Sequence, residues 1–254
     1  MTEAAGHEGQ GKVLHMDPIC DGKYVGAELD LFSSVRNWKA YWGRQVQAHM
    51  RGDVLEVGAG IGSNTAALAV RDLGRWVCLE PDPDFCGKLR ENLLNIKEAG
   101  SYEVVCGNLS NVRGQSFDTI IYIDVLEHIA DDRKELVDAA ALLRPRGQLI
   151  VLSPAYNFLY SPFDAAIGHY RRYDRAMLRN ISPDTLATVS MRYLDCAGSA
   201  LSAANKLLLR QSMPTKSQLQ FWDRWVIPVS RVLDRFIGFS MGKTIIAVWR
   251  KPGD

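Results

Sequence analysis

Three glycines and two acidic residues carry the clearest chemical signal in this sequence. Gly58, Gly60 and Gly62 follow a short apolar run, with Glu56 just before them and Glu80 farther along. Glycine lets a tight turn bring its backbone close to a ligand, because no Cβ atom stands in the way. A carboxylate twenty positions after the middle glycine, at the end of the next predicted strand, can accept hydrogen bonds from both hydroxyls of a ribose. The pattern therefore predicts a nucleoside-containing cofactor.

The spacing of the glycines separates two classes of cofactor. A dinucleotide fingerprint has the spacing G-x-G-x-x-G, whereas this turn has G-x-G-x-G, with Ser63 where the last glycine would stand. Glu56, inside the end of the first predicted strand, is a second departure from that fingerprint. Both features disfavour an NAD-dependent oxidoreductase, which stays as a weaker alternative.

The same residues resemble the first motif of the class I S-adenosylmethionine-dependent methyltransferases, an acidic residue followed by G-x-G-x-G. Two later segments are similar to the same family. F-D-T-I-I-Y-I-D-V-L-E-H-I, residues 117–129, resembles its fourth strand and following turn, and L-L-R-P-R-G-Q-L-I-V-L, residues 142–152, resembles its fifth strand with the preceding turn. The resemblance covers residues 40–155 and returns at 243–250. It implies an α/β, Rossmann-like fold with a doubly wound, seven-stranded and mostly parallel sheet, and S-adenosyl-L-methionine as the cofactor.

The resemblance also implies roles for individual residues. The glycine loop would hold the methionine part of the cofactor, Glu56 would orient its amino group, and Glu80 would bind the ribose. Asp124, at the end of the fourth predicted strand, would face the methionine end. Asp82 would flank the adenine, or would begin the next helix, where an acidic residue is favourable. Asn108, where many relatives carry Asp, would accept a hydrogen bond from the adenine amino group or form a turn.

Two histidines are the candidate catalytic residues. A base is useful if the acceptor is a hydroxyl, and an imidazole with its ordinary pKa of about 6.5 suits neutral pH. His128, in D-V-L-E-H-I, is a base or a structural hydrogen-bonding group. His169, in G-H-Y-R-R-Y, is a base or a residue that pins its loop. The sequence shows neither an Asp and Asn cluster nor the Cys and His spacing of a metal site, so no catalytic metal is expected.

The acceptor side is expected in residues 153–175, after the fifth strand. This segment is rich in aromatic residues and has little periodicity, which indicates a loop that forms a wall or lid of the acceptor pocket. The candidate substrate contacts are Tyr156, Tyr170, Arg171 and Tyr173. An arginine beside aromatic residues clamps a carboxylate or phosphate, or makes contacts within its own loop.

Strands and helices alternate along the chain, as a parallel sheet with helices on both faces requires. Strands are predicted at 53–57, 75–80, 102–106, 117–123, 147–152, 188–194 and 244–249. Helices are predicted at 31–50, 63–72, 83–97 and 131–143. Ligands bind at the carboxyl ends of strands arranged in this way.

Residues 196–242 are predicted to form an insertion before the last strand. Apolar residues recur there at the spacing of one helix face: Val229, Val232, Leu233, Phe236 and Ile237. Pro228 is expected to start or kink this helix. Four roles are open for this helix. It packs on its own domain, or closes over an apolar acceptor, or forms a dimer face, or contacts a membrane surface.

Composition narrows the class of protein. A chain of 254 residues with 47% apolar content is long enough for one domain, expected at 31–254 after a mobile segment at 1–30. A net charge of +1 gives no electrostatic footprint for nucleic acid. The five cysteines form no C-x-x-C pair, the N-terminus lacks a signal-peptide profile, and no apolar run reaches the roughly 20 residues of a membrane span. We expect reduced cysteines and a cytoplasmic protein.

These features together predict an enzyme that methylates a small, apolar or amphiphilic molecule, with oxygen as the leading acceptor atom. N- or C-methylation of a natural product or lipid-linked acceptor is the alternative. A non-catalytic cofactor-binding partner subunit is a further, weaker reading. Contact with a membrane surface and oligomer formation both stay open.

Overall fold

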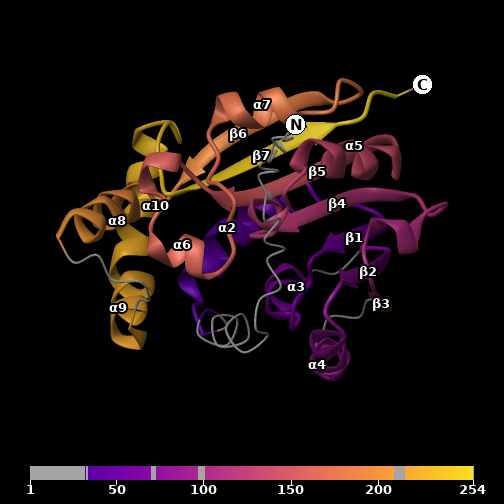
Figure 1. The fold of residues 1–254 in the computed structure, drawn as a ribbon, viewed down its shortest axis with the longest axis horizontal. Helices are drawn as coiled ribbons and strands as arrows, with labels where there is room; N and C mark the ends of the chain where they lie inside the picture. The colour runs from indigo at the N-terminus through magenta and orange to yellow at the C-terminus, as the bar shows by residue number, and fades with distance from the viewer. Residues whose placement is uncertain (1–31, 33, 70–72, 97–100, 209–214, 254) are drawn as a thin grey trace, which may run out of the picture.

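A seven-stranded sheet forms the centre of the molecule (Figure 1). The computed structural model describes residues 32, 34–69, 73–96, 101–208 and 215–253. The strands are β1 (Val54–Val57), β2 (Arg75–Glu80), β3 (Ser101–Cys106), β4 (Phe117–Ile123), β5 (Leu143–Pro154), β6 (Ala187–Leu194) and β7 (Thr244–Arg250). Their order is β3-β2-β1-β4-β5-β7-β6, and only β7 runs antiparallel to its neighbours. The predicted fold class is confirmed.

Helices cover both faces of this sheet (Figure 1). α5 (Asp132–Ala141) and α7 (Arg175–Ile181) pack on one face. The other face is covered by α2 (Asn37–Gln47), α3 (Ser63–Leu68), α4 (Pro83–Leu93) and α10 (Ile227–Phe236). Strands buried on both faces consist largely of apolar residues, as in β4, where Ile120, Ile121 and Tyr122 are fully buried.

The segment after β5 is more regular than predicted. Residues 153–175 were expected to lack secondary structure, but they contain the 3-10 helix η3 (Asn157–Leu159) and the short helix α6 (Pro162–Ala166). A capping box explains α6, because Asp164 Oδ2 accepts hydrogen bonds from the Ser161 N–H at 2.8 Å and the Ser161 hydroxyl at 2.9 Å. The expectation of an irregular loop is therefore wrong.

The cysteine prediction is also wrong in part. Cys86, in α4, and Cys106, at the end of β3, form a disulfide with a Cα–Cα distance of 6.1 Å. α4 packs against β3, which brings together two positions that are twenty residues apart. Cys106 is exposed, whereas Cys78 is buried in β2 as expected. Cys20 lies outside the described residues.

Three aspartates fix the inserted helices to the rest of the molecule. The insertion contains α8 (Cys196–Leu208), α9 (Lys216–Phe221), the π-helical turn η4 (Trp222–Val226) and α10. Asp223 accepts hydrogen bonds from the backbone N–H groups of Arg36, Asn37 and Trp38 at 3.1, 3.2 and 2.8 Å. It thereby caps α2, which begins at residue 37 rather than at the predicted residue 31.

The other two aspartates are fully buried. Asp195 directly precedes α8, and Asp234 lies in α10. Asp234 Oδ2 accepts hydrogen bonds from the Tyr41 hydroxyl at 2.8 Å and from the Asp195 N–H at 2.7 Å. Asp195 in turn accepts from the Trp222 indole N–H at 2.8 Å. Pro228 lies in the first turn of α10, directly after the π-helical turn, as its missing N–H predicts.

One face of the insertion presents large apolar side chains to solvent. We call it the α10 apolar face, and it comprises Phe221, Trp225, Val229, Val232, Leu233 and Phe236, which are 42–84% exposed. Within the described part of the chain, no helix is both long and apolar enough to cross a bilayer.

Replacing the Asp223 carboxylate should destabilise the fold measurably. Asp223→Ala leaves three N–H groups at the start of α2 without their acceptor, so the free energy of unfolding should fall by about 1–3 kcal/mol. Urea titration followed by circular dichroism measures this change. Asp184→Ala, at an exposed position, is the matched control, and equal stability of the two variants would contradict the capping role.

Candidate functional site

The glycine loop follows β1 in a conformation that favours glycine. Gly58, Gly60 and Gly62 have φ values of 70°, 55° and 83°. A Cβ atom on Gly58 would lie 2.5 Å from Val125 Cγ2, so the loop can lie this close to the turn after β4 only without a side chain. The N–H groups of Gly58 and Ala59 donate to the Leu79 carbonyl at 2.8 and 3.1 Å, which anchors the loop on β2.

Glu80 joins the loop to the end of β2. Its Oε2 accepts a hydrogen bond from the Gly60 N–H at 2.7 Å, and its Oε1 accepts one from the Asp82 N–H at 3.0 Å. The side chain is 6% exposed, and burial raises the pKa of its carboxyl. Both oxygens of the carboxylate thus accept backbone hydrogen bonds at the end of β2, and the ribose contact of Glu80 stays a prediction.

Glu56 lies beneath the loop and is 1% exposed. Its Oε2 accepts hydrogen bonds from the Thr65 hydroxyl at 2.8 Å and from the Trp76 indole N–H at 3.0 Å. Burial raises the pKa of Glu56 to about 7, although these two hydrogen bonds favour the ionised form. One oxygen of this carboxylate thus links the end of β1 to α3 and to β2.

Asp124 and Lys39 form an oppositely charged pair of groups beside the loop. Asp124 follows β4 with a φ of 55° and is exposed, yet desolvation by the surrounding protein raises its pKa to about 7, opposed by Lys243 and Lys39. Burial lowers the pKa of Lys39 to about 8, opposed by Asp124 and Glu56. The sequence analysis missed Lys39. Its only sequence signal is a lysine next to Trp38 in an otherwise apolar stripe of the helix.

Asp82 and Asn108 both act as caps in the structure. Asp82 Oδ1 accepts hydrogen bonds from the N–H groups of Asp84 and Phe85 at 2.8 and 3.3 Å. Asn108 Oδ1 accepts from the Ser110 N–H at 3.0 Å and from its hydroxyl at 2.6 Å. These contacts are the structural alternatives expected for both residues, and their contacts with adenine stay predictions.

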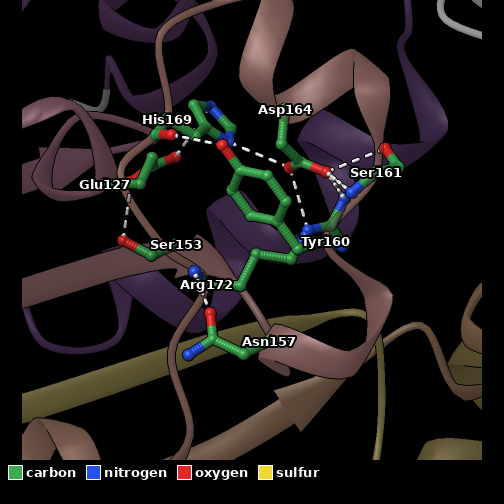
Figure 2. Close-up of polar contacts among 8 residues, drawn as sticks. All are labelled: Glu127, Ser153, Asn157, Tyr160, Ser161, Asp164, His169 and Arg172. Atoms are coloured by element: carbon green, nitrogen blue, oxygen red, sulfur yellow. Dashed lines mark hydrogen bonds and ion pairs between the residues drawn. The ribbon is translucent and has the colours of Figure 1, made fainter.

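The two candidate catalytic histidines lie edge to face, with ring centroids 4.6 Å apart. His169 is buried, with Nδ1 3.0 Å from Asp164 Oδ1 and Nε2 3.9 Å from Glu127 Oε1 (Figure 2). His128 is exposed, and desolvation together with the neighbouring His169 lowers its pKa to about 4. The structure therefore brings together two residues that are forty-one positions apart in the sequence.

Asp164 and Arg172 support this pair, and the sequence analysis missed Asp164. Arg172 donates from Nε to Asp164 Oδ1 at 2.8 Å and from Nη2 to Oδ2 at 3.0 Å. Burial opposes ionisation of Asp164, but hydrogen bonds from His169 and Arg172 hold its pKa well below the usual range. The capping pattern S-P-F-D was the available signal for Asp164.

Glu127 occupies the turn after β4 and is fully buried. Its Oε2 accepts a hydrogen bond from the Ser153 hydroxyl at 2.9 Å. Burial and the nearby Asp124 raise its pKa well above the usual value.

The four predicted substrate contacts have different surroundings. Tyr170 is 45% exposed, and Tyr156 is half-buried, stacked on Tyr193 at 4.7 Å. Arg171 donates to the Asp132 carboxylate and to the Ala130 carbonyl, which lie in and just before α5, outside its own loop.

Tyr173 corrects a prediction. Its side chain is fully buried, and its hydroxyl lies 2.8 Å from Asp132 Oδ2 and 3.1 Å from the Leu126 carbonyl. The structure thus gives Tyr173 a packing role in place of the expected substrate contact.

A family model described as a methyltransferase domain matches residues 55–149, which include the glycine loop, Glu80 and the turn after β4. This part of the chain matches a methyltransferase domain.

The methyltransferase domain resembles solved structures over most of the chain. An O-methyltransferase family protein from Burkholderia thailandensis has a TM-score of 0.60 and 15% identity, covering 92% of this chain and 61% of that one. Phosphoethanolamine N-methyltransferase 2 from Haemonchus contortus, in complex with S-adenosyl-L-methionine, has a TM-score of 0.58 and 14% identity, covering 90% and 56%. At these identities the likeness shows the fold alone.

One curated relative also matches the chain. An uncharacterized 37.1 kDa protein in transposon TN4556 from Streptomyces fradiae is 24% identical over 160 residues. The match covers 60% of this chain and 46% of that protein, so the chain spans less than half the length of this relative.

Glu80→Ala should weaken cofactor binding by about 10- to 100-fold, because hydrogen bonds to a charged group contribute about 1.5–3 kcal/mol. Calorimetric titration with S-adenosylhomocysteine measures the affinity. Glu91→Ala, at an exposed position in α4, serves as the control. An unchanged affinity in a variant with a normal thermal transition would refute the ribose role of Glu80.

Glu56 should make stability depend on pH. A carboxyl with a folded pKa near 7 and an ordinary value of 4.5 binds its proton more tightly in the folded state, so its contribution to stability decreases as pH rises between those values. Glu56→Gln removes this effect while keeping an acceptor for Thr65 and Trp76. From pH 5 to 8 the stability of the variant relative to wild type should rise by about 2 kcal/mol. Urea titrations across that range test this, and a constant difference would count against it.

Proposed function

We propose that this protein transfers the methyl group of S-adenosyl-L-methionine to a small, apolar or amphiphilic molecule, at an oxygen atom. The observation that supports this most is the shared location of two sets of residues. Glu80 and the glycine loop lie beside the turn after β4, and that turn carries Asp124 and His128. We further propose that residues 31–254 act as one domain, with 153–175 on the acceptor side.

The cofactor, when bound, supplies a methyl group on a sulfonium that needs no further activation. The protein then has to align the acceptor with this methyl group and to exclude water. In this proposal the backbone of the glycine loop and Asp124 bind the methionine part of the cofactor, and the carboxylate of Glu80 binds its ribose. The low pKa of His128 keeps its exposed imidazole neutral at pH 7, so it can accept a hydrogen bond from an acceptor hydroxyl.

Exposed aromatic and apolar residues support an amphiphilic acceptor. Phe158 and Tyr170, in the segment after β5, are 66% and 45% exposed. The insertion with the α10 apolar face begins just after β6, which ends at the same edge of the sheet as β5. A lipid-like acceptor or a membrane surface fits this arrangement.

An amine acceptor is the second candidate. The structural neighbour from Haemonchus contortus is an N-methyltransferase, and the exposed carboxyl group of Asp124 would accept a hydrogen bond from an amine N–H. N-methylation therefore belongs in the same test.

Ligand binding and an acceptor screen test the function together. Titration calorimetry should show binding of S-adenosylmethionine and S-adenosylhomocysteine but not of NAD. Release of S-adenosylhomocysteine should then exceed the acceptor-free background with hydroxylated apolar or amphiphilic molecules, and should fall at least tenfold for matched amines. Binding of NAD alone would overturn the function, and turnover confined to amines would replace the proposed acceptor atom.

A further inference from the structure

We propose that Glu127, His128 and His169 bind a divalent transition metal ion such as Zn²⁺. One ligand atom from each residue lies within 4.8 Å of those from the other two. Ligand atoms around tetrahedral Zn²⁺ are about 3.3 Å apart, so small side-chain movements would close the site. Two imidazoles and one carboxylate form a ligand set that Zn²⁺ and Fe²⁺ use in proteins.

The carboxylate of Glu127 supplies an independent reason for an ion. Its Oε1 atom is buried and, among the described residues, has no hydrogen-bond partner. The nearest cationic candidate, His169 Nε2, is 3.9 Å away, which is too far for a hydrogen bond. A buried carboxylate oxygen without a partner costs free energy, and a bound cation would remove that cost. The Ser153 hydroxyl holds the other oxygen at 2.9 Å and so leaves Oε1 free for the ion.

The hydrogen-bond partners of His169 are those expected of a histidine that binds a metal ion. Histidine ligands usually donate a hydrogen bond from the second ring nitrogen to a carboxylate. This bond fixes the orientation of the ring and its tautomer. Here Nδ1 lies 3.0 Å from Asp164, and Nε2 is the nitrogen nearer Glu127. Arg172 and Ser161 fix Asp164 in turn, and Figure 2 shows this chain of contacts from Ser161 to Ser153.

A purely structural cluster explains only part of this arrangement. Contacts of Asp164 with His169 and Arg172 would hold the segment after β5 in place without any metal. They do not explain why Glu127 Oε1 lacks a partner among the described residues. The sequence predicted no metal because the ligands come from two segments forty-one positions apart.

An ion held by three protein ligands would keep one coordination position open, and the acceptor would bind there. This use of the site rests on the proposed function. A hydroxyl bound there would release its proton to water more readily. Its oxygen lone pair would form the new bond to the methyl carbon, and the electrons of the carbon–sulfur bond would stay on sulfur, giving S-adenosylhomocysteine. The ion would then replace a direct hydrogen bond from the acceptor to His128.

Metal binding can be measured without cofactor or acceptor. The full chain is stripped with a chelator, transferred to chelator-free buffer and titrated with Zn²⁺ in a calorimeter, and with Co²⁺ while visible absorption is recorded. We expect one equivalent of Zn²⁺ that His128→Ala and Glu127→Gln each weaken at least tenfold. His49→Ala should bind as wild type does, because His49 lies outside the cluster. Asp164→Asn should weaken binding by about 10- to 100-fold without removing a ligand.

Two results would overturn the site: absence of Zn²⁺ binding by wild type, or equal Zn²⁺ affinity in wild type, His128→Ala and Glu127→Gln. Because His128 is exposed, its replacement leaves the fold intact, and circular dichroism verifies this. The two proposals can fail separately. If the protein binds Zn²⁺ at this site but does not bind S-adenosylmethionine, the metal site stands and the proposed function is wrong. If it binds S-adenosylmethionine but not Zn²⁺, the proposed function stands and the metal site is wrong.

Discussion

The parallel pairing of β1 with β2 on one side and β4 on the other determines where the polar side chains of this protein gather. Val57 is paired with Leu79 in β2 and with Tyr122 in β4, so the three strands end nearly level. Gly58 and Glu80 therefore follow at the same edge, together with Asp124. A shift of one residue in either pairing would turn these side chains to the opposite face of the sheet. The glycine loop is hydrogen-bonded to Leu79 and Glu80, so its shape also depends on this register.

Several carboxylates in one place repel one another and lose hydration, so the fold must supply positive charge nearby. Lys39 and Lys243 supply it, and both act on Asp124. Lys39 comes from α2, and the N-terminus of α2 is capped by Asp223 of the insertion. The inserted helices thus help to position the charge of Lys39 at the site, although they begin more than one hundred residues after Lys39 in the sequence.

Local signals explain which parts of this structure the sequence could predict. Glycine spacing, apolar runs and the acidic residue after β2 located the strands and the loop, because these features depend on neighbouring residues. Lys39 and the Cys86–Cys106 disulfide were missed, because each depends on how a helix packs across the sheet. Tyr173 was assigned to the substrate because aromatic residues surround it, but its hydroxyl finds a partner in Asp132, far away in sequence. Asp164 was missed for the same reason, since its partner His169 contacts it only in the folded segment.

The α10 apolar face also affects how the molecule behaves at a boundary between water and a less polar phase. Phe236 is 84% exposed, and Trp225 is 59% exposed. Water around such groups is released when they meet an apolar surface, so adsorption through this face is favourable. Because Asp223 and Asp234 hold the inserted helices against α2 and β6, the adsorbed molecule would not rotate freely. Every molecule would present the same side of its sheet to the boundary, so adsorption would produce an oriented layer.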